Sequence, residues 1–116
     1  MARKPKSKEP KYPMGSPSQY PNSMLVGDSV WAVKLVRKIE QSSAYGACDP
    51  QVKTIYLEMA QSRKEMMSTF LHELIHAIEI EYGLTIRHKL VGNLEVAFLN
   101  LLAENAVAWH RVLYGD

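Results

Sequence analysis

The stretch that decides the fold is SRKEMMSTFLHELIHAIEIEYG, residues 62–83. Ser62 and Glu65 stand in the spacing of a capping box, in which each side chain bonds the other residue's backbone N–H at the start of a helix. Gly83 is the residue type that most often closes a helix, because it adopts the left-handed conformation without strain. Apolar residues recur between these ends at helical spacing. The stretch therefore predicts an amphipathic helix over residues 63–82.

Within this predicted helix, His72, Glu73 and His76 form an HExxH motif. Positions i and i+4 lie on the same helix face, so the two imidazoles can bind one Zn²⁺ ion. The glutamate after the first histidine can act as general base toward a metal-activated water. Both histidines border the apolar stripe, where two unpaired imidazoles would be costly. We expect His72 and His76 to bind zinc and Glu73 to be catalytic; a hydrogen-bonded structural pair is the alternative.

A hydrolytic zinc site needs a third protein ligand and one open position. The candidate ligands downstream of the motif are Glu79, His88, Glu95, Glu104 and His110. Thr85 is expected to cap a second helix, antiparallel to the first because the connection is short. At ~1.5 Å rise per residue, a fold-back near residue 85 brings Glu95 level with His76. Glu95 is the expected third ligand, with His88 as the alternative if the link after Gly83 swings it back.

The predicted second helix carries an apolar stripe that is expected to pack into the core. Its members are Leu90, Leu94, Ala97, Phe98, Leu101, Ala108 and Val112. Glu95 lies on a different face, beside Val91, Leu99 and Leu102, where a carboxylate needs a partner. Gly92, one turn earlier, would leave room for a metal ion and a substrate.

The region before the first helix predicts strands. Residues 29–39 alternate apolar and polar positions. Residues 44–48 and 53–59 flank Asp49-Pro50, a turn signal, and so predict a hairpin. The expected fold class is α+β, with an antiparallel sheet of about three strands packed on two antiparallel helices.

The chain resembles the minimal zincins often found in phages, of the SprT-like and ImmA/IrrE-like kind. The segments that carry this resemblance are Gly46-Ala47-Cys48-Asp49, Lys53 to Leu57, Thr69 to Glu79, His88 to Glu95, and Asn105. The eighteen residues between the motif and Glu95 resemble the gluzincin spacing, in which a glutamate on the next helix is the third ligand. Many SprT-like proteins use a later histidine, which would be His88. The resemblance also implies that residues 53–59 or a neighbouring strand bind an extended peptide at a sheet edge.

The N-terminal segment differs from the rest of the chain. Residues 1–23 contain five prolines, and residues 1–11 carry a net charge of +4. This composition predicts a disordered basic tail, with weak nucleic-acid contact as one option, and a single zincin-like domain over residues 24–116. No apolar run is long enough to cross a membrane, and the basic N-terminus lacks the apolar segment of a signal peptide. Cys48 is the only cysteine, which suits a reducing cytoplasm, or a host cytoplasm for a phage protein.

These observations predict a zinc-dependent metallopeptidase that cleaves a peptide or protein substrate. One alternative is another zinc hydrolase, acting on nucleic acid; a second is a non-enzymatic regulatory or binding module that contains zinc. Tyr45, Tyr82 and His88 are candidates for stabilising the oxyanion. The substrate and the oligomeric state stay open at this point.

Overall fold

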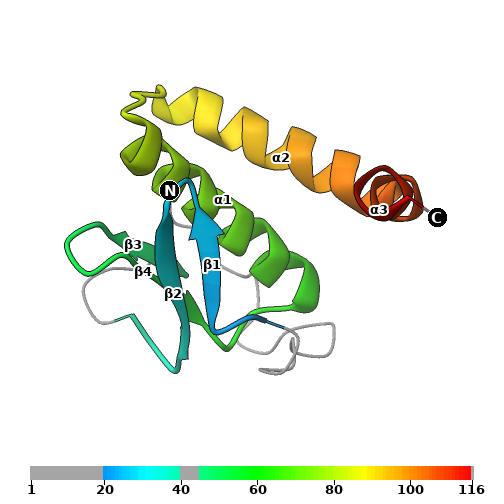
Figure 1. Ribbon diagram of the computed structural model, residues 1–116. Coiled ribbons are helices and arrows are strands. Elements are labelled where there is room, and N and C mark those ends of the chain that lie inside the picture. The colour runs from blue at the N-terminus through cyan, green and yellow to red at the C-terminus, as the bar shows by residue number, and fades with distance from the viewer. Residues whose placement is uncertain (1–19, 40–44, 116) are drawn as a thin grey trace.

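A computed structural model describes residues 20–39 and 45–115. The chain has an α+β fold, as expected, with a small sheet on one side and helices on the other (Figure 1). The elements in chain order are β1 (Ser23–Val26), β2 (Ser29–Val36), β3 (Gly46–Asp49), β4 (Thr54–Glu58), α1 (Arg63–Tyr82), α2 (His88–Glu104) and α3 (Ala106–Tyr114).

The sheet is mixed and has four strands in the order β1-β2-β4-β3. β1 pairs antiparallel with β2, and β3 pairs antiparallel with β4, whereas β2 and β4 run parallel. The expected three-stranded antiparallel sheet was therefore wrong in strand number and in the pairing of its two longest strands. β4 is internal, so it cannot accept a peptide at its side, and β3 is the edge strand next to it.

The predicted β3–β4 hairpin is confirmed. Its turn is stabilised by Asp49, whose Oδ1 atom accepts a hydrogen bond of 3.0 Å from the backbone N–H of Gln51. Such a side-chain turn explains why Asp49-Pro50 was an informative signal.

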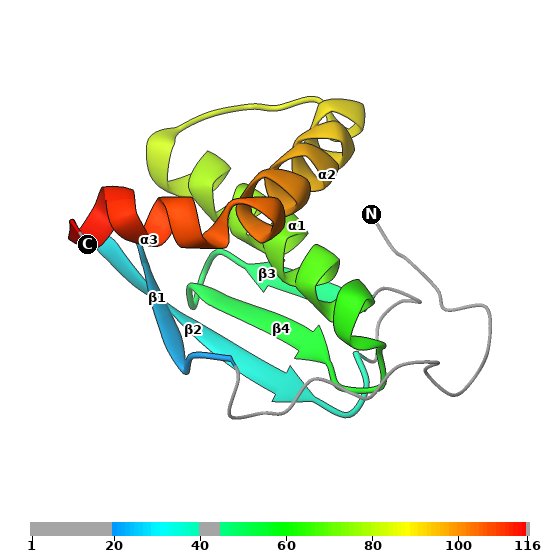
Figure 2. The ribbon, with the colours of Figure 1, turned by 90° about the vertical axis from the view of Figure 1, so that its right-hand side faces the viewer.

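Helix α1 lies across one face of the sheet and forms the core with it (Figure 2). The fully or almost fully buried apolar side chains of this core are Val26, Trp31, Val33, Ile55, Leu57, Met66 and Ala77. At the end of α1, Glu81 accepts a 2.8 Å hydrogen bond from Trp31 Nε1 and pairs with Lys53 Nζ at 2.9 Å. These contacts join the end of α1 to β2 and to the residue before β4, and so hold α1 in place over the sheet.

The predicted ends of α1 are confirmed. Ser62 Oγ accepts a hydrogen bond from the Glu65 N–H, and the Glu65 carboxylate accepts one from the Ser62 N–H. Gly83 closes the helix at φ 64°, in the left-handed conformation that glycine adopts most readily.

The second helix differs from its prediction in three ways. It begins at His88 with Arg87 as N-cap, so Thr85 is not its cap. It ends at Glu104, and α3 then continues at 78° to it. Its apolar stripe is not in the core, because Leu90, Phe98 and Leu101 are 46%, 41% and 44% exposed. Figure 1 shows α2 above α1 and α3 projecting beyond the body of the domain.

The folded part of the chain begins earlier than predicted. Residues 1–19 of the expected tail lie outside the described residues, but Tyr20 packs its ring against Phe70 at 5.4 Å, and Ser23 begins β1. Among the described residues, no single helix is long and apolar enough to cross a membrane, although α2 and α3 meet that criterion together as a bent pair.

Candidate metal centre

The two histidines of the motif meet on the face of α1 that turns toward α2. The Nε2 atoms of His72 and His76 are 3.1 Å apart. His72 is buried and His76 is half-buried. The helical spacing alone explains why the rings are neighbours, and the contacts of their other nitrogen atoms explain why the Nε2 atoms face each other.

A carboxylate contacts the Nδ1 atom of each ring. Glu95 Oε1 lies 2.9 Å from His72 Nδ1, and Glu79 Oε1 lies 2.7 Å from His76 Nδ1. An ionised carboxylate can only accept, so each Nδ1 atom carries the proton and donates it. Histidines that bind metals usually have such a partner, which fixes the tautomer and the orientation of the ring.

This arrangement leaves two Nε2 lone pairs directed at each other. Two lone pairs 3.1 Å apart repel unless a positive charge lies between them, which a shared proton or a metal cation would supply. A tetrahedral zinc ion holds two nitrogen ligands ~3.3 Å apart, from Zn–N bonds of ~2.05 Å. The observed pair therefore fits two ligands of one zinc ion, in donor type and in separation.

Burial also suits His72 to metal binding. Its pKa is lowered by burial, which outweighs the opposing effect of Glu95. A lowered pKa keeps the ring neutral, as a metal ligand must be.

Glu95 does not lie where the expected fold-back placed it. It contacts His72 rather than His76, and it lies on the Nδ1 side of that ring. Its second oxygen, Oε2, accepts a hydrogen bond from Ser68 Oγ. Both carboxylate oxygens of this buried residue are thus engaged away from the Nε2 pair. In this arrangement Glu95 orients His72 and tethers α2 to α1.

His88 lies closer to the pair than the expected helix geometry allowed. The segment after Gly83 runs as an extended link, and its Ile86 N–H donates a 2.8 Å hydrogen bond to Glu79 Oε2. This bond pulls the link back over α1. The exposed His88 ring consequently has its centroid 5.9 Å from that of His72 and 6.2 Å from that of His76.

The three histidine rings are neighbours, but their donor atoms do not converge. Across residues 20–39 and 45–115, no three His, Cys, Asp or Glu side chains stand as a complete metal-binding group. Glu104 is exposed at the end of α2, and His110 lies on α3 against the ring of Tyr114. Glu79 contacts His76 only through Nδ1.

Glu73 is buried beside the edge strand β3. A Cβ atom added at Gly46 would lie 3.0 Å from Glu73 Oε2 and 2.5 Å from Thr69 Cγ2. Only a glycine therefore allows β3 to pass this close to the carboxylate. The pKa of Glu73 is raised by burial, which brings its proton affinity closer to what a base needs near neutral pH.

Two supporting residues were missed by the sequence analysis. Ser68 lies one turn before His72, at i−4, so helical spacing would have identified it as a neighbour. Gln61 is buried and accepts from Thr69 Oγ1 at 2.8 Å, while its Nε2 donates to the Tyr45 carbonyl at 3.2 Å. Gln61 joins the start of α1 to β3, a long-range role that no local pattern indicates.

The candidates for oxyanion stabilisation are dispersed. Tyr82 is 62% exposed at the far end of α1, next to Gly27. Tyr45 precedes β3, and its pKa is raised by burial and then by the carboxylates of Glu58, at the end of β4, and Glu65, in the first turn of α1. Of the three candidates, His88 alone contacts the histidine pair.

Comparisons with protein-family models, curated proteins and solved structures give no match for this chain.

Proposed function

We propose that the chain is a zinc-dependent metallopeptidase. The observation that carries this proposal is the pair of Nε2 atoms 3.1 Å apart, each ring held by a carboxylate at Nδ1. A structural histidine pair does not need two carboxylates that both direct the lone pairs inward. A pair that binds a cation needs them, because they fix both tautomers.

In this proposal His72, His76 and His88 hold the zinc ion. His88 is exposed, and the centroid of its ring lies 5.9 Å from that of His72 and 6.2 Å from that of His76. Glu95 was the expected third ligand, but its two oxygens already bond His72 and Ser68. We therefore assign Glu95 an orienting role and His88 the third position, as in the SprT-like alternative.

A bound zinc ion would supply an acidified water and would polarise the scissile carbonyl. Glu73 would take a proton from the attacking water and deliver it to the departing amine. Burial supports both steps because it raises the pKa of Glu73. The carboxylate is then a stronger base toward water, and the protonated form persists until the amine takes up the proton.

The edge strand β3 provides a place for the substrate. Within residues 20–39 and 45–115 it pairs with β4 alone, so the N–H and C=O groups of its other side can pair with an extended peptide. Gly46 begins β3 and lies directly beneath Glu73. A peptide added along β3 would bring a backbone carbonyl past the catalytic glutamate, with selectivity for extended backbone more than for particular side chains.

The test combines metal analysis with two hydrolysis assays. Protein purified without a histidine tag should contain about one zinc per chain and should cleave unfolded casein. Single-stranded and double-stranded nucleic acids are assayed in parallel. Zinc content near zero, with no uptake on titration, would refute the metal site. Full zinc content with cleavage of nucleic acid alone would replace the peptidase with a nuclease.

A further inference from the structure

Helices α2 and α3 leave a large apolar surface uncovered. The stripe on α2, called here the α2 stripe, consists of Leu90, Leu94, Ala97, Phe98 and Leu101. Three of its members are more than 40% exposed. α3 has no buried residue, and Val112, Leu113 and Tyr114 are each about 70% exposed, at 73%, 68% and 72%.

The size of this surface bears on what can cover it. The α2 stripe together with Trp109 presents apolar surface on the order of 400 Å², within the roughly 300–600 Å² of the largest patch on a typical monomer. A stable homodimer buries about 800 Å² on each partner. About 65% of such an interface is apolar, or roughly 520 Å², so the α2 stripe with Trp109 supplies most of the apolar area that a dimer needs.

We infer that a second copy of this chain covers the α2 stripe, in an isologous dimer where each stripe packs on the other. The spacing of the stripe supports this occupant. Leu90, Leu94, Ala97 and Leu101 follow one another at intervals of four, three and four residues, the pattern with which one helix packs along another. The stripe contains no charge, so two identical stripes can meet without repulsion.

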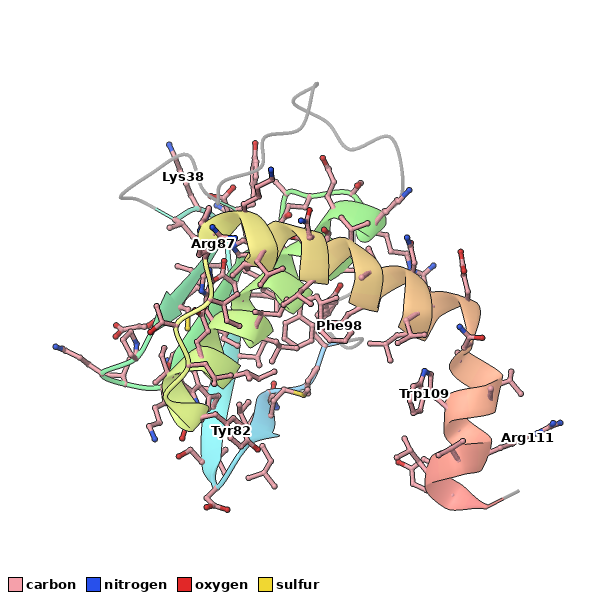
Figure 3. The ribbon with its side chains drawn as sticks, turned by 90° about the horizontal axis from the view of Figure 1, so that it is seen from above. Lys38, Tyr82, Arg87, Phe98, Trp109 and Arg111 are labelled. Atoms are coloured by element: carbon pink, nitrogen blue, oxygen red, sulfur yellow. The ribbon has the colours of Figure 1, made fainter. Side chains whose placement is uncertain are left out.

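The angle between the helices adds to the interface. Figure 3 shows Phe98 and Trp109 on the inner side of the bend between α2 and α3, and Arg111 on the outer side, pointing away. The bend of 78° thus forms an apolar corner with its charged residue outside. A helix of the partner can lie against this corner while Arg111 stays in solvent.

A lipid surface fits the same helices less well. Helices that lie on membranes usually carry many lysines and arginines beside the apolar face. α2 and α3 together have one lysine, Lys89, and one arginine, Arg111, against Glu95 and Glu104. Glu95 is also buried against His72 and Ser68, which holds α2 on the domain.

The experiment measures the mass of the 116-residue chain by sedimentation over a concentration series, with and without added zinc. Leu101→Glu places a charge in the α2 stripe, and Val96→Glu is the control. Val96 is on the same helix and is 54% exposed, but it lies on a different face from the stripe. Both positions are exposed in the single chain, so neither change should prevent folding, which circular dichroism verifies.

The expected result is twice the 13.2 kDa mass of the chain. Leu101→Glu should raise the dissociation constant by ~100-fold or more, since the change occurs twice in one interface, while Val96→Glu should leave it within ~3-fold. A monomer at every concentration would overturn the inference. A monomer that sediments with liposomes would overturn it as well, because a lipid surface would then cover the helices. A dimer that both changes weaken equally, or that neither weakens, would also overturn it.

Discussion

The Nδ1 atom of His72 lies 2.9 Å from Glu95 Oε1, across 23 residues of chain. This contact joins the helix that carries the motif to the helix that begins with His88. Because Ser68 bonds the other oxygen of Glu95, the carboxylate is held between two residues of α1, one turn apart. Glu95 and Val91 are the buried residues of α2, so this polar contact is part of what positions α2 and, with it, His88.

Glu73→Gln should retain zinc and lower peptide hydrolysis by ~100-fold or more, because an amide cannot accept the proton of water. Zinc content and casein cleavage are measured on the same preparation. Glu104→Gln, at the exposed end of α2, is the matched control and should retain both. Loss of zinc together with activity in Glu73→Gln would make Glu73 a ligand or a structural residue.

His88→Ala should weaken zinc binding by ~100-fold or more and leave the stability of the metal-free protein unchanged, because the side chain is exposed. Competition with a chromogenic chelator measures the affinity, and thermal unfolding in chelator measures the stability. His110→Ala, on α3, is the control for loss of a remote imidazole. Unchanged affinity in His88→Ala would return the third position to Glu95.

Glu95→Ala should act differently, by lowering stability even without metal. It leaves the Nδ1 atom of His72 and the hydroxyl of Ser68 without their buried partner, at a cost of ~1–3 kcal/mol. Zinc affinity should fall ~10–100-fold, as for other residues that orient a ligand. Chemical unfolding in chelator distinguishes the two roles, since a residue that only binds metal would leave metal-free stability intact.

Gly46→Ala should impair catalysis more than zinc binding. The new methyl group would overlap Thr69 Cγ2 and press on Glu73, and its three nearest contacts would all be atoms of these two residues. The control is Gly92→Ala in α2, where a Cβ meets nothing within 4 Å. Gly92→Ala should raise stability by ~0.5–1 kcal/mol, because alanine loses less backbone entropy in a helix. Equal activity in the two variants would contradict the close approach of β3 to Glu73.

The pairing of Glu81 should make stability depend on pH. Hydrogen bonds from Lys53 and Trp31 lower the pKa of Glu81 below its ordinary value near 4.5. A lowered folded-state pKa stabilises the protein above the unfolded value, and this contribution disappears as pH falls through the folded value. Glu81→Gln should therefore lower the melting temperature at pH 7 and lower it by less at pH 3, measured in chelator. A constant difference across this range would argue against the ion pair.

Cys48 should be a slow nucleophile in the folded protein. Burial, and then the carboxylate of Glu73, raise the pKa of its thiol to about 12. At pH 8 the thiolate fraction is then on the order of 10³-fold lower than for an ordinary cysteine. The rate of reaction with a disulfide reagent should fall by about that factor on folding. Equal rates in native and denatured protein would show that the thiol is neither buried nor perturbed.

Local patterns predicted the parts of this protein that depend on a few consecutive residues. The capping box at Ser62, the left-handed glycine at Gly83 and the Asp49 turn were all identified correctly. Each involves hydrogen bonds between residues no more than five positions apart, so their geometry follows from backbone sterics. The neighbouring positions of His72 and His76 follow from helical periodicity in the same way.

The predictions that were wrong concern contacts between segments that are far apart in the sequence. The parallel contact of β2 with β4 joins strands separated by a segment whose path no local signal indicates. The apolar stripe of α2 has the periodicity of a core helix, but periodicity does not say which molecule covers it.

The sequence by itself determined the helix α1, its two ends, and the placement of two imidazoles and a carboxylate on it, because these follow from bonds along one helix. Tertiary structure alone decided that Glu95 bonds the Nδ1 atom of His72, that Ile86 bonds Glu79 and draws His88 over the pair, and that Gly46 passes beneath Glu73. Each of these joins α1 to another element. They exist because buried polar groups must find partners, and those partners are available only once the helices and the sheet have packed.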